Sequence, residues 1–151
     1  MHQPVFTILL FASALLSACH TREVGQTNSV KMIEAPNTEP EIKDIIIDPK
    51  LDAANLGGSG TSIDSISVKG DILSIFATYG GGCKKHIFDL YSTGIYAKSL
   101  PPQLTIYLKH VNNDDRCKKL VIQELKFNIA AVKYKRGSLI IKLGDSSVKY
   151  Q

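Results

Sequence analysis

Two cysteines and two histidines in the second half of the sequence have the types and spacing that could carry chemistry. Cys83 stands three residues before His86, and His110 stands seven residues before Cys117. Two thiols can form a disulfide, whereas two thiolates and two imidazoles can hold zinc tetrahedrally. Asp115 adds a carboxylate that could also ligate a metal. These residues therefore define the candidate site.

The two cysteines are predicted to form a disulfide, because they are an even pair in a chain expected to enter an oxidising compartment. Closing this loop would stabilise the fold by roughly 3–4 kcal/mol. Two zinc sites are the alternatives. One is a Cys2His2 site, and the other is a metal held by His86, His110 and Asp115 with the disulfide intact. No other cofactor is expected.

Alternating apolar residues predict how the two histidines meet. His86 shares one strand face with Phe88 and Leu90, and His110 shares another with Leu108. If strands 84–91 and 103–110 pair antiparallel with Phe88 opposite Leu108, His86 lies directly opposite His110. Both cysteines then fall just beyond that end of the sheet. The two imidazoles are expected to titrate as a coupled unit.

The same residues carry a resemblance to known proteins. The segments resemble a group of small exported bacterial lipoproteins, frequent in Bacteroidota, that have no assigned activity. The matching positions are Gly82, Cys83, His86 and Phe88, followed by Leu108, His110, Asn113, Asp115 and Cys117. The resemblance covers about 40 residues. It implies an envelope location and a shared Cys/His site, and it implies no reaction.

The elements that must position these residues are predicted to be strands, since apolar residues alternate with period two between turn signals. Lys69-Gly70-Asp71 is expected to be a hairpin turn, and Pro101-Pro102 should bound the strand that follows. The pattern predicts an all-β, single-domain antiparallel β-sandwich, immunoglobulin-like, or a small barrel, with about seven strands.

The N-terminal region is typical of a lipoprotein signal peptide. Residues Val5 to Leu16 form an apolar run of 12 residues, too short to span a bilayer and suited to an export signal. The run leads to Leu16-Ser17-Ala18-Cys19, which resembles the bacterial lipobox. Residues 1–18 are therefore predicted to be cleaved, and Cys19 to carry diacylglycerol and a fatty acyl chain such as palmitate.

The position after Cys19 indicates where the lipoprotein resides. His20 stands there instead of Asp, which by resemblance to Gram-negative lipoproteins points to the outer membrane, facing the periplasm. Residues 19–43 are polar and predict a disordered tether, followed by a β domain over 44–151. Residues 51–151 hold 14 basic and 8 acidic side chains, a net charge of +6. This charge fits an ordinary surface or an anionic partner.

These observations predict a non-catalytic binding or assembly module held at the membrane by its lipid. Its ligand is expected to be a protein or a glycan, not a nucleic acid. Gly80-Gly81-Gly82 lacks phosphate-loop spacing, and no pair of carboxylates suits acid/base catalysis, so an enzyme is not expected. The alternatives are a metal-dependent protein using His86 and His110, and an inhibitor of a secreted enzyme.

Overall fold

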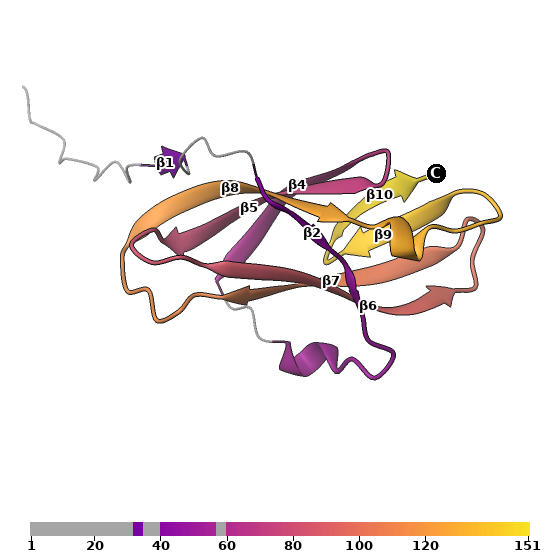
Figure 1. Cartoon of the computed structure of the whole chain (residues 1–151), viewed down its shortest axis with the longest axis horizontal. Coiled ribbons are helices and arrows are strands. Elements are labelled where there is room, and N and C mark those ends of the chain that lie inside the picture. The colour runs from indigo at the N-terminus through magenta and orange to yellow at the C-terminus, as the bar shows by residue number, and fades with distance from the viewer. Residues whose placement is uncertain (1–31, 35–39, 57–59) are drawn as a thin grey trace, which may run out of the picture.

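The described part of the chain is built almost entirely from strands (Figure 1). The computed structural model describes residues 32–34, 40–56 and 60–151, so the predicted signal peptide and Cys19 lie outside it. The strands are β1 (Met32–Glu34), β2 (Ile42–Asp44), β3 (Ile46–Ile47), β4 (Thr61–Lys69), β5 (Ile72–Gly81), β6 (Ile87–Ala97), β7 (Gln103–Val111), β8 (Lys119–Asn128), β9 (Leu139–Leu143) and β10 (Ser146–Tyr150). Two short 3-10 turns, Ala53–Asn55 and Ala130–Val132, complete the elements.

Two sheets pack face to face as a β-sandwich, which confirms the predicted fold class. One sheet has the order β1-β8-β5-β4, with β2 also paired to β8, and the other has the order β10-β9-β7-β6-β3. The strands β4 to β10 are the seven longer ones. The sheets are mixed rather than purely antiparallel, because β7 pairs with β9 in parallel. β8 follows β7 in the sequence but lies in the other sheet, so the chain crosses over and back and enters β9 in the direction of β7.

The core contains the side chains that the alternation assigned to it. Along β5, Leu73, Ile75 and Ala77 are buried, while the intervening Phe76 is exposed. Successive side chains of a strand point to opposite faces, so one face of each sheet fills the space between them. Most of the other alternating apolar residues are buried too: Phe88, Leu90, Leu104, Ile106, Val121, Leu125, Phe127, Ile129, Leu139, Ile141 and Leu143. Ile66, Val68 and Leu108 are partly buried and pack against this core.

Turns form where the sequence predicts them. β4 and β5 pair as a hairpin closed at Lys69 and Ile72, and Gly70 has a positive φ of 60° in the turn. A glycine adopts this conformation without a steric penalty. Pro101-Pro102 precedes β7, as expected for residues that cannot lie in a central strand.

A short segment joins the two sheets on one side of the sandwich. We call residues Ile42–Ile47, which comprise β2 and β3, the strap. β2 pairs with β8 in one sheet, and β3 pairs with β6 in the other, with the buried Ile45 at the crossing (Figure 1). On the opposite side, β10 lies against β4. Both open sides of the sandwich are thereby covered.

The structure differs from the sequence prediction at the end of the expected tether. Most of residues 19–43 lie outside the described part of the chain, but β1 and the first residues of β2 fall within that range and pair with β8. Three-residue strands carry too little periodicity to be read from sequence. Within the described ranges, none of the helical segments has the length and apolar character needed to cross a membrane.

Candidate functional site

A disulfide joins the two loops at one end of the sandwich. Cys83 lies between β5 and β6, and Cys117 lies between β7 and β8. The two residues are bonded with their Cα atoms 5.9 Å apart, within the normal range for a disulfide. The predicted pairing is therefore confirmed.

The two histidines lie on one face of their strands but are not directly opposite each other. Phe88 pairs with His110, so the predicted register is wrong by two residues. A slip of two keeps every side chain on its face, because the side-chain period of a strand is also two. The rings meet diagonally, with Nδ1 of His86 2.7 Å from Nε2 of His110 and ring centroids 4.9 Å apart.

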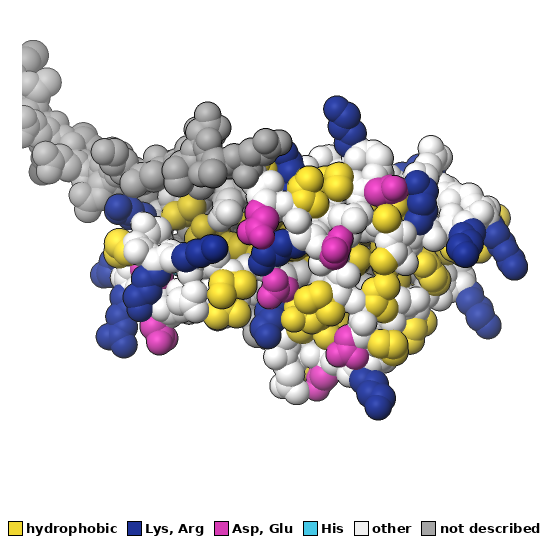
Figure 2. Space-filling model, in the orientation of Figure 1, with side chains coloured by type: hydrophobic (Ala, Val, Ile, Leu, Met, Phe, Trp, Pro, Cys, Tyr) yellow, Lys and Arg dark blue, Asp and Glu magenta, His cyan; other side chains and the backbone are white. Residues whose placement is uncertain are grey.

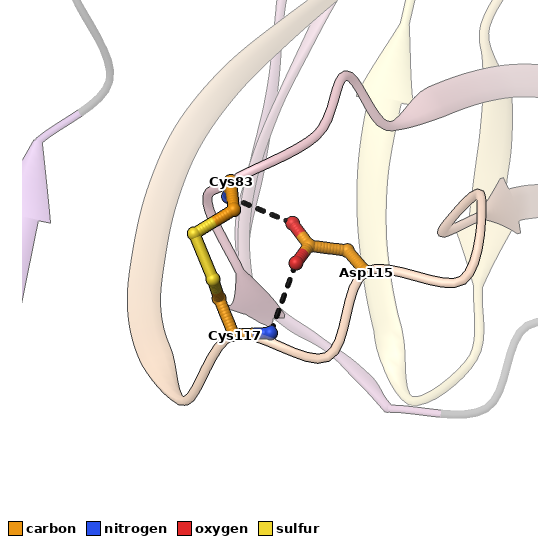
Figure 3. A group of neighbouring side chains, drawn as sticks. All are labelled: Cys83, Asp115 and Cys117. Carbon is orange, nitrogen blue, oxygen red and sulfur yellow. Dashed lines mark hydrogen bonds between the residues drawn. A yellow bond between two sulfur atoms is a disulfide. The ribbon is translucent and has the colours of Figure 1, made fainter.

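Asp115 holds the two loops together (Figure 3) and also contacts His86. Its Oδ2 accepts the backbone N–H groups of Cys83 and Lys84, each at 2.8 Å, and its Oδ1 accepts that of Cys117 at 2.9 Å. His86 Nε2 lies 3.2 Å from Oδ2, and both side chains are only 1% exposed. The N–H of Cys117, followed by that of Lys84, lowers the pKa of Asp115 well below its usual range.

Thr61 completes this network, although no pattern in the sequence points to it. Its Oγ1 lies 2.6 Å from Nδ1 of His110, at the start of β4. A hydrogen-bonded chain therefore runs from Thr61 through His110 and His86 to Asp115. We call these four residues the buried chain. A threonine at the start of a strand is common, and only the distant strand pairing brings it to the histidines.

The buried chain has a preferred direction when both imidazoles are neutral. Thr61 then donates to His110, His110 donates to His86, and His86 donates to the carboxylate of Asp115. A proton added to Nδ1 of His110 reverses the first of these bonds, so that His110 donates to Thr61 as well as to His86. If each imidazole carried an added proton, an N–H of His86 would face an N–H of His110 across the 2.7 Å between Nδ1 and Nε2. Burial, and secondarily the charge of His86, lowers the pKa of His110, which favours the neutral ring.

Aromatic side chains enclose the imidazoles. Phe88 stacks on His110 with centroids 4.4 Å apart and planes inclined by 7°, and Tyr79 contacts His86 at 4.6 Å. The Tyr79 hydroxyl donates to Oε1 of Gln123 at 2.7 Å, while burial, and then the charge of Asp115, raises the pKa of Tyr79. The rings keep water away from the histidines and fix their orientation.

The metal sites considered from the sequence fit this arrangement poorly. Tetrahedral zinc bound at about 2.0–2.1 Å would separate two imidazole nitrogens by about 3.3 Å, whereas those of His86 and His110 are 2.7 Å apart. Their other ring nitrogens face Asp115 and Thr61. Cys83, Asp115 and Cys117 also lie close enough to share an ion, but both sulfurs belong to the disulfide. Zinc binding would require the rings or the sulfurs to separate.

A cavity of about 400 Å³ borders His86 on the side of the strap. It lies between the strap, the start of β6 and the middle of β8, with Phe88 and Phe127 among the apolar lining residues. Lys43 of the strap donates to the carbonyl oxygen of Phe88 at 2.9 Å and to Asp89 at 3.1 Å. These bonds tie the strap to the second sheet beside the cavity.

Comparison with known proteins identifies the fold and no family. No family model and no curated protein matches the chain. A protein of unknown function from Bacteroides vulgatus has a similar structure, with a TM-score of 0.52, 15% identity and coverage of 75% of this chain and 56% of that one. A NigD-like immunity protein from Bacteroides caccae is also similar, with a TM-score of 0.50, 14% identity and coverage of 72% of this chain and 58% of that one.

A third similar structure is a protein from Parabacteroides distasonis described as toxin-related. Its TM-score is 0.49, with 21% identity and coverage of 72% of this chain and 59% of that one. The chain therefore spans less than two thirds of the length of each of these three proteins. At these identities the likeness concerns the fold alone.

Proposed function

We propose that this chain is a lipid-anchored envelope protein that binds another protein without catalysing a reaction, in the manner of an immunity protein. Its partner would be an exported protein toxin, which binding would neutralise. Three lines of reasoning support the proposal: the closed hydrogen bonding of the buried chain, an exposed apolar face, and the predicted export signal. The apolar face is the observation that carries it.

The buried chain supports a structural role for the candidate site. The imidazole nitrogens of His86 and His110 and the carboxylate of Asp115 all have partners within the protein. A catalytic group needs access to a reacting atom, but the side chains of His86 and Asp115 are almost fully buried. Their evident task is to hold the two disulfide-linked loops in place.

The strap presents isoleucines to solvent. Ile42, Ile46 and Ile47 are exposed, and Ile95 on the neighbouring β6 is 68% exposed. Ile47 lies against Gly94, where an added Cβ would be 3.0 Å from its Cγ2, so Ile47 packs on the β6 backbone at the residue before Ile95. Figure 2 shows apolar side chains gathered on the face where the strap lies. Such a patch on an otherwise polar surface is typical of a protein-binding site.

The envelope location is inferred from the sequence. The apolar run ending in the lipobox would export the chain, and the diacylglycerol on Cys19 would anchor it in the outer membrane, facing the periplasm. A disulfide persists in that oxidising compartment, and Cys83–Cys117 is consistent with it. The name of the Bacteroides caccae protein suggests the immunity role, which we extend to this chain as part of the proposal.

A capture experiment tests the binding face. The full chain is used as bait for proteins secreted by competing bacteria, and the captured protein is then tested for toxicity. The double variant Ile47→Ser/Ile95→Ser should lose this protein, while Leu100→Ser should retain it. Leu100 is 99% exposed in the connection between β6 and β7 and is not one of the four isoleucines, which makes it a control of similar hydrophobicity. Equal capture by both variants would contradict the proposed face, and capture of only non-toxic proteins would contradict the immunity role.

A second experiment tests the anchor. Cys19→Ser should leave the protein unlipidated, so it should no longer fractionate with envelope membranes. Mass spectrometry of the wild-type protein should find diacylglycerol and acyl chains on the N-terminal cysteine. Normal membrane fractionation of the variant would contradict the lipoprotein assignment while leaving the binding face untouched.

A further inference from the structure

We propose that the disulfide end of the domain docks on the anionic headgroups of the membrane that holds the lipid anchor. This inference rests on the anchor in the proposed function and adds a second, electrostatic contact to it. The surface comprises Lys84 and Lys85 between β5 and β6, with Arg116, Lys118 and Lys119 between β7 and β8 or at the start of β8. We call these five residues the basic rim. All five are exposed.

The basic rim has an excess of positive charge that is free to face outward. The neighbouring acidic side chains are Asp114, which is exposed, and Asp115, which is buried against three backbone N–H groups and His86. Glu41 and Glu124 line the cavity that Lys85 also borders, and Glu124 is already paired with Lys126. Asp115 therefore contributes little to neutralising the outer surface. Each lysine or arginine near an anionic leaflet is worth about 1 kcal/mol, so five together give a useful attraction.

The path of the chain places the basic rim next to the membrane. β1 pairs in parallel with β8, and Met32 lies opposite Leu120, one residue beyond Lys119. The segment from Cys19 therefore joins the domain at this end, as Figure 1 shows for β1. Met32 is the thirteenth residue after Cys19, and a chain of this length could span at most about 45 Å. The described chain therefore begins beside the basic rim.

The two loops are held as a rigid platform. The disulfide joins them covalently, and Asp115 bonds to the backbone of both Cys83 and Cys117. Lys84 Nζ also donates across the loops to the carbonyl oxygen of Asn113 at 2.9 Å. Little loop ordering is then needed when the cations meet phosphate groups, and ordering is a main cost of binding. The strap lies on the side of the sandwich and stays available to a protein partner.

Vesicle binding tests this inference without the lipid. The exported chain carrying Cys19→Ser is sedimented with vesicles of phosphatidylethanolamine and phosphatidylglycerol, and with neutral phosphatidylcholine vesicles. We expect binding to the anionic vesicles only, weakened by salt. Lys118→Gln/Lys119→Gln should lower the partition coefficient about 30-fold. Lys135→Gln/Arg136→Gln removes the same charge between β8 and β9, beyond the far end of β8, and should leave it unchanged.

Three results would overturn the inference. The first is equal binding of the protein to both vesicle types, and the second is an equal loss of vesicle binding in the two double variants. The third is a Lys118→Gln/Lys119→Gln variant that keeps vesicle binding but no longer captures an acidic protein that the unsubstituted chain binds. The last result would assign the basic rim to a protein partner. Because these measurements use unlipidated protein, failure of the anchor would show only in the fractionation of Cys19→Ser. The two failures are therefore distinguishable.

Discussion

Replacing Gly81 with alanine should disrupt the contact between His86 and Asp115. A Cβ at this position would lie 2.5 Å from Nε2 of His86, 2.6 Å from its Cε1 and 3.0 Å from Oδ2 of Asp115. The side chains are enclosed, so they cannot simply turn away. Gly81 also has a φ of 141°, which L side chains rarely adopt.

The loss in free energy of unfolding for Gly81→Ala follows from these two causes. Inserting a methyl group into a packed site costs about 1–3 kcal/mol, and a non-glycine residue in such a backbone conformation costs about 1–3 kcal/mol. We therefore expect a free energy of unfolding lower by about 2–5 kcal/mol. For a domain of this size, the Tm should fall by at least about 8 °C. Thermal unfolding followed by circular dichroism measures it.

The neighbouring Gly80 supplies the control. An added Cβ there meets nothing within 4 Å, so Gly80→Ala should change the free energy of unfolding by less than about 0.5 kcal/mol. His86→Ala removes the ring that the new methyl would strike. In a double-mutant cycle, the steric part of about 1–3 kcal/mol should therefore vanish in that background. Equal Tm values for Gly81→Ala and Gly80→Ala, or an additive cycle, would refute the reasoning.

Three further predictions concern the same end of the molecule. Reduction of Cys83–Cys117, which closes a separation of 34 residues, should lower the free energy of unfolding by about 4 kcal/mol; two free thiols in protein from the native envelope would contradict the bond. Because the pKa of His110 is lowered, its stabilising contribution is present above about pH 6.5 and lost as pH falls through the lowered value. The stability that ionised Asp115 contributes should be lost only below about pH 3.9. Urea unfolding measured across this pH range, with His110→Gln as the control, separates the contributions of His110 and Asp115. Zinc added to the oxidised protein should not bind stoichiometrically by calorimetry, and tight binding would show that the imidazoles separate.

The sequence was sufficient to predict the strands and their buried faces, because alternation at residues such as Leu73, Ile75 and Ala77 depends only on local pattern. It could not specify the register. A slip of two residues between β6 and β7 leaves the same faces buried, so Phe88 could be placed opposite Leu108 or His110 without any change in pattern.

The candidate site was predictable in its members and not in its connections. The cysteines and histidines are uncommon enough to stand out in the sequence, but Thr61 joins them only through contacts made across the sandwich. The glycine run at 80–82 shows no phosphate-loop spacing, and its role could not be read from the sequence. A glycine is required at position 81 because the β5 backbone there lies against the His86 side chain, which comes from the segment just before β6.

The pairing of β1 with β8 would make the length of the proposed anchor adjustable. Only three residue pairs hold β1, so its release costs little compared with unfolding the domain. Releasing Met32–Glu34 would add three residues to the segment that precedes the domain, or up to about 10 Å of reach. Tension on the anchored protein would extend this segment first and leave the seven longer strands intact. A partner bound to the strap could then be held at a greater distance from the lipid.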